Sequence, residues 1–311
     1  MNTEIFVKYN KKLQESCGKV IIGKEEIIRQ LGVCLVASGH VLLEDLPGTG
    51  KTMLLRAFSK SIGGDFKRIQ FTPDILPSDL TGIHFFNQKK GEFEFRQGPL
   101  FANVVLADEI NRAVPRSQSA LLEVMEERQI SVDGTTFRLD EPYIVMATQN
   151  PVESYGTFPL PEAQLDRFFM KLSMGYMTEE QEKQVLRRED SKEIVERLEQ
   201  VVSAEELAEL RSEYRKVEVS EDVMNYIMSI ITATRRSDKL AYGVSARGSL
   251  ALCRASQITA AMEGRGYVAP EDVKKEAVAV LAHRIAMSSG SHMDTAMFIS
   301  DLLETLSVPL E

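Results

Sequence analysis

The residues most able to do chemistry lie in Leu46-Pro47-Gly48-Thr49-Gly50-Lys51-Thr52, between an apolar run at 41–45 and a helical pattern at 52–61. The glycines let backbone N–H groups turn toward phosphate oxygens, and the helix start adds the positive end of its dipole. Lys51 can reach β- and γ-phosphates, and the Thr52 hydroxyl is a ligand for Mg²⁺. This strand–loop–helix setting predicts a Walker A loop for ATP.

One position departs from the usual G-x-x-x-x-G-K-[ST] pattern, because Asp45 replaces the first glycine. That position begins the loop and does not contact phosphate, so nucleotide binding is still predicted. The alternative is a chance Gly-Lys-Thr in a turn.

A second set of candidate residues ends the apolar run Asn-Val-Val-Leu-Ala-Asp-Glu at 103–109. Beside a phosphate loop, Asp108 is expected to hold the Mg²⁺ shell and Glu109 to take a proton from the attacking water. An acidic pair that only marks the end of a strand is the alternative.

Three polar residues further along the chain are weaker candidates. Asn150 ends the run at 143–150, where its amide could orient the water, although Asn-Pro also opens turns. Arg167 precedes the last apolar run, and a surface ion pair with Asp166 or Glu162 is the alternative. Arg247 lies at the start of a helical pattern, where the helix dipole disfavours a cation, so local helix stability does not explain it.

The elements that must position these residues alternate between strand and helix in the first half of the chain. Near-continuous apolar runs predict strands buried on both faces of a mostly parallel sheet. The expected fold is therefore α/β, an αβα sandwich with a five-stranded sheet over residues 1–176. The predicted strands are 41–45, 66–71, 103–109, 143–150 and 168–174.

Two hairpins and a helical second half complete the predicted organisation. The hairpins cover 83–95 and 129–139, and the second has an Asp-Gly turn. After residue 176 the strand pattern stops, and helix-start patterns such as Thr178-Glu-Glu-Gln follow. We expect an all-helical subdomain over 177–311.

Composition restricts the class of protein further. The net charge of −9 argues against sequence-independent binding to nucleic acid, which requires a basic surface. The three cysteines are widely spaced without a CxxC pair, so thiols in a reducing compartment are expected. The start of the chain does not resemble a signal peptide, and the longest apolar stretch, 33–43, is too short to span a bilayer. These features predict a cytoplasmic protein.

The ordered motifs resemble the MoxR family of AAA+ ATPases over about residues 20–283. The resemblance is carried by LLEDLPGTGKT, VVLADEINRA, QSALLEVMEERQI, ATQNPVE, FPLPEAQLDRF and GVSARGSLAL. It implies a core followed by a helical lid, with the 83–95 hairpin inserted in helix 2 and the 129–139 hairpin preceding sensor 1.

The same resemblance implies individual roles. Asn150 corresponds to sensor 1, Arg167 to the arginine finger and Arg247 to sensor 2, with catalysis completed by Glu109. Thr52 and Asp108 are the expected Mg²⁺ residues. The expected nucleotide contacts are Ile22, Gly23, Pro47, Gly48, Thr49, Gly50, Lys51, Thr52 and Met53, with Ile21-Ile22-Gly23 at the adenine.

The expected function is a ring ATPase that remodels or matures partner proteins in a chaperone-like role. The resemblance to the family implies that the ring is a hexamer. Proteins with von Willebrand factor A domains are the implied partners. A nucleotide-gated scaffold with little turnover is one alternative, and a nucleic-acid motor is another. The sequence leaves open the protein substrate, whether Arg247 acts in its own subunit or a neighbour, and whether Arg112 or Arg116 replaces Arg167 across the interface.

Overall fold

A parallel five-stranded sheet forms the centre of the computed structural model, which describes residues 2–44, 48–149, 156–187, 191–288 and 293–308. Its strand order is β2-β5-β8-β1-β9, and every neighbouring pair runs in the same direction. The strands are β1 (Val41–Glu44), β2 (Phe66–Gln70), β5 (Val104–Asp108), β8 (Ile144–Gln149) and β9 (Met170–Leu172). The five strands predicted from the sequence are confirmed.

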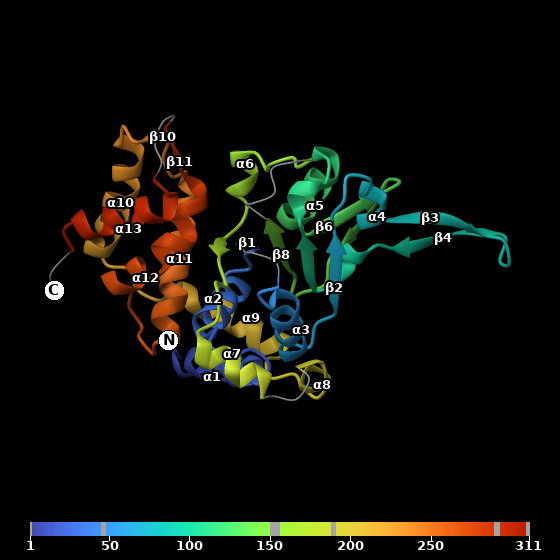
Figure 1. Cartoon of the computed structure of the whole chain (residues 1–311), viewed down its shortest axis with the longest axis horizontal. Coiled ribbons are helices and arrows are strands. Elements are labelled where there is room, and N and C mark those ends of the chain that lie inside the picture. Colours follow the sequence, from blue (N-terminus) through green and yellow to red (C-terminus); the bar gives the residue numbers. More distant parts are fainter. Residues whose placement is uncertain (1, 45–47, 150–155, 188–190, 289–292, 309–311) are drawn as a thin grey trace.

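Both faces of the sheet are buried, because successive side chains of a strand point to opposite sides. On β5, Val104 and Leu106 pack into one hydrophobic cluster, whereas Val105 and Ala107 pack into a second. Helices α1, α2 and α3 contribute to the first cluster, and α4 and α5 contribute to the second (Figure 1). These helices are α1 (Glu4–Gly18), α2 (Glu25–Val36), α3 (Lys51–Ser61), α4 (Pro77–Thr81) and α5 (Pro115–Glu127).

Both predicted hairpins are confirmed. The first pairs β3 (Gly82–Asn87) with β4 (Glu92–Gln97) and extends away from the rest of the molecule (Figure 1). The second pairs β6 (Gln129–Val132) with β7 (Thr135–Arg138). The rings of Phe95 and Phe137 stack with centroids 4.7 Å apart, so the base of the first hairpin packs against the second.

The second half of the chain is mainly helical, but it is not all-helical as predicted, because two short strands at 240–242 and 286–287 pair within it. Its helices form two groups. Helices α7, α8 and α9 lie near α1–α3, while α10–α13 form a separate group on the other side (Figure 1). The predicted boundary at residue 176 stays a prediction. The helices are α6 (Glu162–Leu165), α7 (Glu179–Leu186), α8 (Ser191–Glu196), α9 (Ala204–Glu213), α10 (Glu221–Arg236), α11 (Ala246–Met262), α12 (Pro270–Leu281) and α13 (Thr295–Thr305).

The structure adds small elements that the apolar pattern did not predict. Two short strands, β10 (Leu240–Tyr242) and β11 (Ala286–Met287), pair antiparallel beside the helices α10–α13. They are too short for an alternating pattern to be recognised in the sequence. Single 3₁₀ turns occur at Pro99–Phe101, Ile110–Arg112, Tyr214–Lys216 and Ala282–Arg284.

A buried polar contact joins the core to the second half. Arg29 of α2 lies 2.6 Å from the carboxylate of Glu276 on α12, and Thr259 of α11 donates to the same carboxylate at 2.7 Å. Arg29 and Glu276 are almost fully buried, so each requires the other to offset its lost hydration. The two halves are therefore packed against each other through a specific ion pair.

The three cysteines are thiols, as the sequence predicts. Cys17 and Cys34 are buried, Cys253 is half-buried, and all three are free thiols. Within the described ranges, no helix is long and apolar enough to cross a bilayer.

His40, directly before β1, connects three elements of the core. The Val145 N–H of β8 donates to its Nδ1 at 2.9 Å, so the ring proton lies on Nε2, which donates to the Met125 carbonyl of α5 at 2.9 Å. Burial lowers the pKa of His40 from 6.5 to about 4. Protonation would also remove the acceptor used by Val145, so the neutral ring is part of the native core.

We predict that His40 makes folding stability fall as the pH drops from 6.5 to 4. In this window the unfolded chain binds a proton at His40 and the folded chain does not, which removes about 3 kcal/mol by the lower end of the window. Urea unfolding across this range should show a shallower pH dependence for His40→Asn than for the wild type. The buried His283 is present in both proteins and cancels in the comparison. Equal pH slopes would contradict the prediction.

Candidate nucleotide-binding site

The phosphate-loop residues lie at the carboxyl end of β1, where α3 begins. Gly48 and Gly50 have φ values of 85° and 87°, a region that glycine adopts without steric cost. Gly50 is the residue before Lys51, the first residue of α3, so the N-terminus of this helix, the positive end of its dipole, lies directly at the loop. Pro47 lies outside the described residues. The observed loop has the backbone shape that an anion site requires.

A cavity of about 360 Å³ joins this loop to the ends of the neighbouring strands. Asp108, the last residue of β5, and Glu109, the next residue, line it beside the end of β8. The described residues that line it are Gly48, Thr49, Gly50, Lys51, Thr52, Met53, Arg68, Asp108, Glu109, Thr148 and Gln149. The predicted phosphate loop and the predicted acidic pair are thus brought together in one cavity.

Thr148 of β8 orients both acidic residues. Its hydroxyl donates to Asp108 Oδ1 at 2.6 Å and accepts the Glu109 backbone N–H at 2.8 Å. Glu109 itself has a φ of 58°, in the left-handed region that costs a non-glycine residue about 1–2 kcal/mol. The Thr148 hydrogen bond helps to hold this strained backbone, which directs the Glu109 side chain into the cavity.

Two residues of the edge strand β2 belong to this site and were missed by the sequence analysis. Arg68 donates to Asp108 Oδ2 at 2.6 Å, and Gln70 Nε2 donates to Glu109 Oε2 at 2.8 Å. Their i, i+2 spacing puts both side chains on one face of β2. Only the parallel register, which aligns Gln70 with Asp108, brings that face to the acidic pair, and no sequence pattern encodes it.

The donors around Asp108 fit a magnesium ion bound together with phosphates. Thr52 and Asp108 line the same cavity, and Mg²⁺ in such sites takes only one or two protein ligands, with water and phosphate oxygens as the others. Among the described residues there is no cluster of three or more His, Cys, Asp or Glu side chains suited to a metal. Arg68 holds one Asp108 oxygen in this structure and would have to release it for that oxygen to become a ligand.

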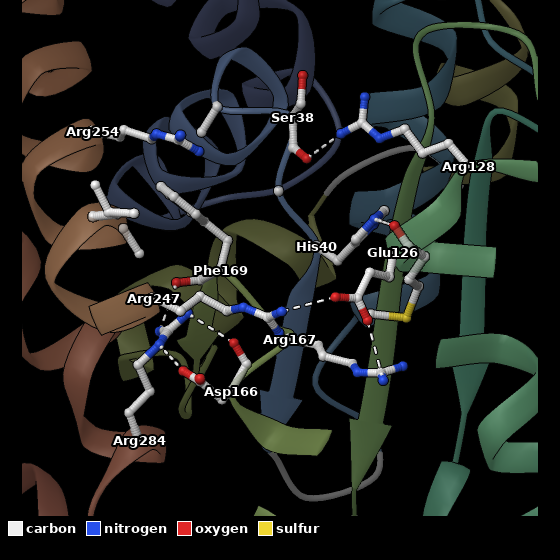
Figure 2. A pocket seen from close by; sticks show the side chains of 15 residues that line it. Ser38, His40, Glu126, Arg128, Asp166, Arg167, Phe169, Arg247, Arg254 and Arg284 are labelled. Carbon is white, nitrogen blue, oxygen red and sulfur yellow. Dashed lines mark hydrogen bonds and ion pairs between the residues drawn. The ribbon is translucent and has the colours of Figure 1, made fainter. Parts of the chain in front are cut away.

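Arg167 and Arg247 do not line this cavity in the part of the chain that the structure describes. They line a different cavity, of about 300 Å³. There each arginine forms an ion pair with one of the two carboxylate oxygens of Glu126 (Figure 2). Nearby, Arg284 pairs with Asp166 at 2.8 Å. Burial lowers the pKa of Arg284 to about 10, and the Asp166 carboxylate opposes this shift, so Arg284 stays charged at neutral pH.

The remaining candidates are distributed elsewhere. Ile22 and Gly23 line a third cavity and not the phosphate-loop cavity. The side chain of Gln181 on α7 packs directly against Gly23. Arg112 lies 3.0 Å from Glu109, whereas Arg116 is exposed in the first turn of α5. Asn150 lies outside the described residues. The structure therefore brings together the loop and the acidic pair, and separately the two arginines.

Comparison with known proteins agrees with this architecture. The sequence model of the ATPase family associated with various cellular activities (AAA) matches residues 40–170, and that of the AAA lid domain matches residues 232–301. A solved structure from Cytophaga hutchinsonii superposes with a TM-score of 0.90 at 40% identity, covering 99% of this chain and 98% of that one. The fold and the site define an AAA ATPase with a helical lid.

Relatives over the whole chain identify the family within this class. The chain is 38% identical to "Chaperone MoxR1" of Mycobacterium tuberculosis, covering 94% of this chain and 80% of that protein. It is 46% identical to the Bacillus subtilis protein YeaC, covering 96% and 95% of the two chains. The chain belongs to the MoxR family of AAA ATPases.

Proposed function

We propose that this protein binds and hydrolyses ATP with Mg²⁺, as a ring oligomer that remodels or matures partner proteins. The observation that carries the proposal is the single cavity lined by the phosphate loop and by the acidic pair at the end of β5. Phosphoryl transfer to water needs both, since one part positions the phosphates and the other activates the water.

The residues of the cavity divide the chemistry between them. Lys51 and the N-terminal N–H groups of α3 bind the phosphates, and Glu109 takes the proton of the attacking water. Thr52 and Asp108 would hold magnesium, which supplies positive charge to the phosphate oxygens when bound. Gln70 and Thr148 fix the position of Glu109, so the base is oriented before the water arrives.

The position of the arginines favours an assembly. Hydrolysis develops charge at the γ-phosphate, which an arginine stabilises well when a neighbouring subunit supplies it. Arg167 and Arg247 line a different cavity from the phosphate loop of their own chain. We infer that they reach the nucleotide of a neighbouring copy, with Arg167 as the main contributor.

The proposed role toward other proteins rests on the family. One relative is named a chaperone, and the β3–β4 hairpin extends away from the rest of the molecule (Figure 1). We infer that substrates are recognised through the two hairpins or through partner proteins, such as those with von Willebrand factor A domains, in the cytoplasm.

Lys51→Ala is expected to abolish tight ATP binding, because the β- and γ-phosphates lose their cation. Isothermal titration calorimetry measures the effect directly. Lys60→Ala is the matched control: Lys60 lies on the same helix, half-exposed, with Glu196 3.9 Å away. ATP binding by Lys51→Ala equal to that of Lys60→Ala would contradict the position of the site.

Glu109→Gln is expected to keep ATP bound while hydrolysis falls by roughly two to four orders of magnitude, the usual effect of removing a general base. Asp108→Asn is instead expected to change the dependence of activity on Mg²⁺ concentration. Steady-state ATPase assays over a Mg²⁺ titration measure both. An unchanged turnover number in Glu109→Gln would exclude Glu109 as the base.

Arg167→Ala is expected to leave ATP binding nearly intact and to lower hydrolysis, because the lost contact belongs to the transition state. Mixing it with Lys51→Ala should restore activity, since one variant keeps a working pocket and the other keeps a working arginine. The ATPase rate is measured against mixing ratio, after light scattering has established that both variants assemble. A flat, inactive curve with mixed assemblies would mean that Arg167 acts within its own subunit.

A further inference from the structure

Glu126, in the last turn of α5, binds two arginines that come from different halves of the chain. Arg167 follows α6 in the core, and its Nη2 lies 3.1 Å from Glu126 Oε2. Arg247 Nη2, in the first turn of α11, lies 2.8 Å from Glu126 Oε1. Figure 2 shows the carboxylate between the two guanidinium groups. One side chain therefore determines where both arginines point.

The two arginines would not meet without this carboxylate. Like charges repel, and the dipole of α11 adds a further unfavourable interaction for Arg247 near its N-terminus. Arg247 and Arg167 keep 50% and 32% of their side-chain surface exposed, so the ion pairs contribute little to folding stability. The main effect of the two ion pairs is to orient the guanidinium groups of Arg167 and Arg247.

The backbone that carries Glu126 is fixed from two sides. His40 donates to the carbonyl of Met125, the preceding residue. Arg128, which ends α5 with a φ of 52°, returns its N–H to the Val124 carbonyl and is held by Glu141 at 2.7 Å. A carboxylate on such a support can position flexible arginines, which carry large rotamer entropy.

The cavity around Glu126 has an excess of positive charge. Arg167, Arg247 and Arg254 line it, and no ion pair joins Arg254 to any residue within the described ranges. Asp166, which also lines the cavity, is already neutralised by Arg284. Arg167 and Arg247 thus share the carboxylate of Glu126, and Arg254 adds a third positive charge that is not balanced by an ion pair in the described part of the chain. The cavity is suited to an anion with several charges, such as a polyphosphate.

We propose that Glu126 is the positioning residue of this two-arginine centre, and that it holds Arg167 and Arg247 together for the polyphosphate of a nucleotide bound to a neighbouring copy. This inference rests on the proposed ATPase function. Glu126 itself touches the arginines and not the nucleotide. Loss of Glu126 therefore lowers turnover but does not change the affinity for ATP of the phosphate loop in the same subunit.

The test compares Glu126→Gln, which keeps the shape and removes the charge, with Glu126→Asp, which keeps the charge on a shorter arm. Glu127→Gln is the matched control, because it removes the same charge one residue later, at an exposed position where the described part of the chain provides no ion pair. We expect kcat to fall about ten-fold or more in Glu126→Gln, with KM for ATP nearly unchanged. Glu126→Asp should retain more activity, and Glu127→Gln should equal the wild type.

Two further measurements separate positioning from a structural defect. Mixing Glu126→Gln with Lys51→Ala should restore hydrolysis, since the defect lies in the arginines offered to a neighbour. In an Arg167→Ala background, Glu126→Gln should cause a much smaller additional decrease, because residues that act through one another are not additive.

Each contrary result overturns a different statement. An unchanged or higher kcat in Glu126→Gln, or an equal decrease in Glu127→Gln, overturns the positioning role. Absence of recovery in mixed assemblies overturns its action across the interface. If Glu126→Gln does not assemble, the same comparison with Glu126→Asp decides, and full activity there overturns the need for this geometry. A wild-type protein without Lys51-dependent hydrolysis overturns the proposed ATPase function itself.

Discussion

The parallel pairing of β5 with β8 is the constraint on which the candidate site depends. The main-chain register aligns Ala107 with Ala147, so Asp108 and Thr148 leave the sheet at the same edge. Their side chains then join through a hydrogen bond of 2.6 Å, and the same hydroxyl holds the strained backbone of Glu109. The phosphate loop follows β1 in the sequence, and β1 is the neighbour of β8 on the side opposite β5. Because the carboxyl ends of parallel strands meet at one edge, the backbone hydrogen bonds of the sheet bring together residues such as Asp108 and Thr148, which are 40 positions apart in the sequence.

Charge is divided between two cavities in this chain. The phosphate-loop cavity combines Lys51 and Arg68 with two carboxylates, whereas Arg167, Arg247 and Arg254 lie at the other cavity around Glu126. An enzyme that develops charge on a transferred phosphate needs cations close to it. The separation of these two groups within one chain is the physical reason for expecting the complete site to form only between copies.

At both sites, neutral residues help to fix a carboxylate or the backbone that carries it. Gln70 and Thr148 fix Glu109, and His40 fixes the helix end before Glu126. We infer that these hydrogen bonds serve mainly to orient the carboxylates. The ion pairs of Glu126 with Arg167 and Arg247 are partly exposed and contribute little to folding stability. The buried ion pair between Arg29 and Glu276 is different, because both partners are desolvated and its geometry ties the core to the helical second half.

The sequence alone determined the strands, the phosphate loop and the acidic pair, because these depend on local patterns: apolar runs, a Gly-Lys-Thr before a helix, and carboxylates at a strand end. It also indicated Arg247 as unusual, since a cation at the start of a helix opposes the dipole, and it proposed Arg167 by resemblance to the family. It could not determine Arg68 and Gln70 as partners of the acidic pair, or Glu126 as the partner of the two arginines. These contacts depend on strand register and on where the end of α5 lies relative to Arg167 and to α11. Such contacts join residues 39–121 positions apart, and only the tertiary structure sets those distances.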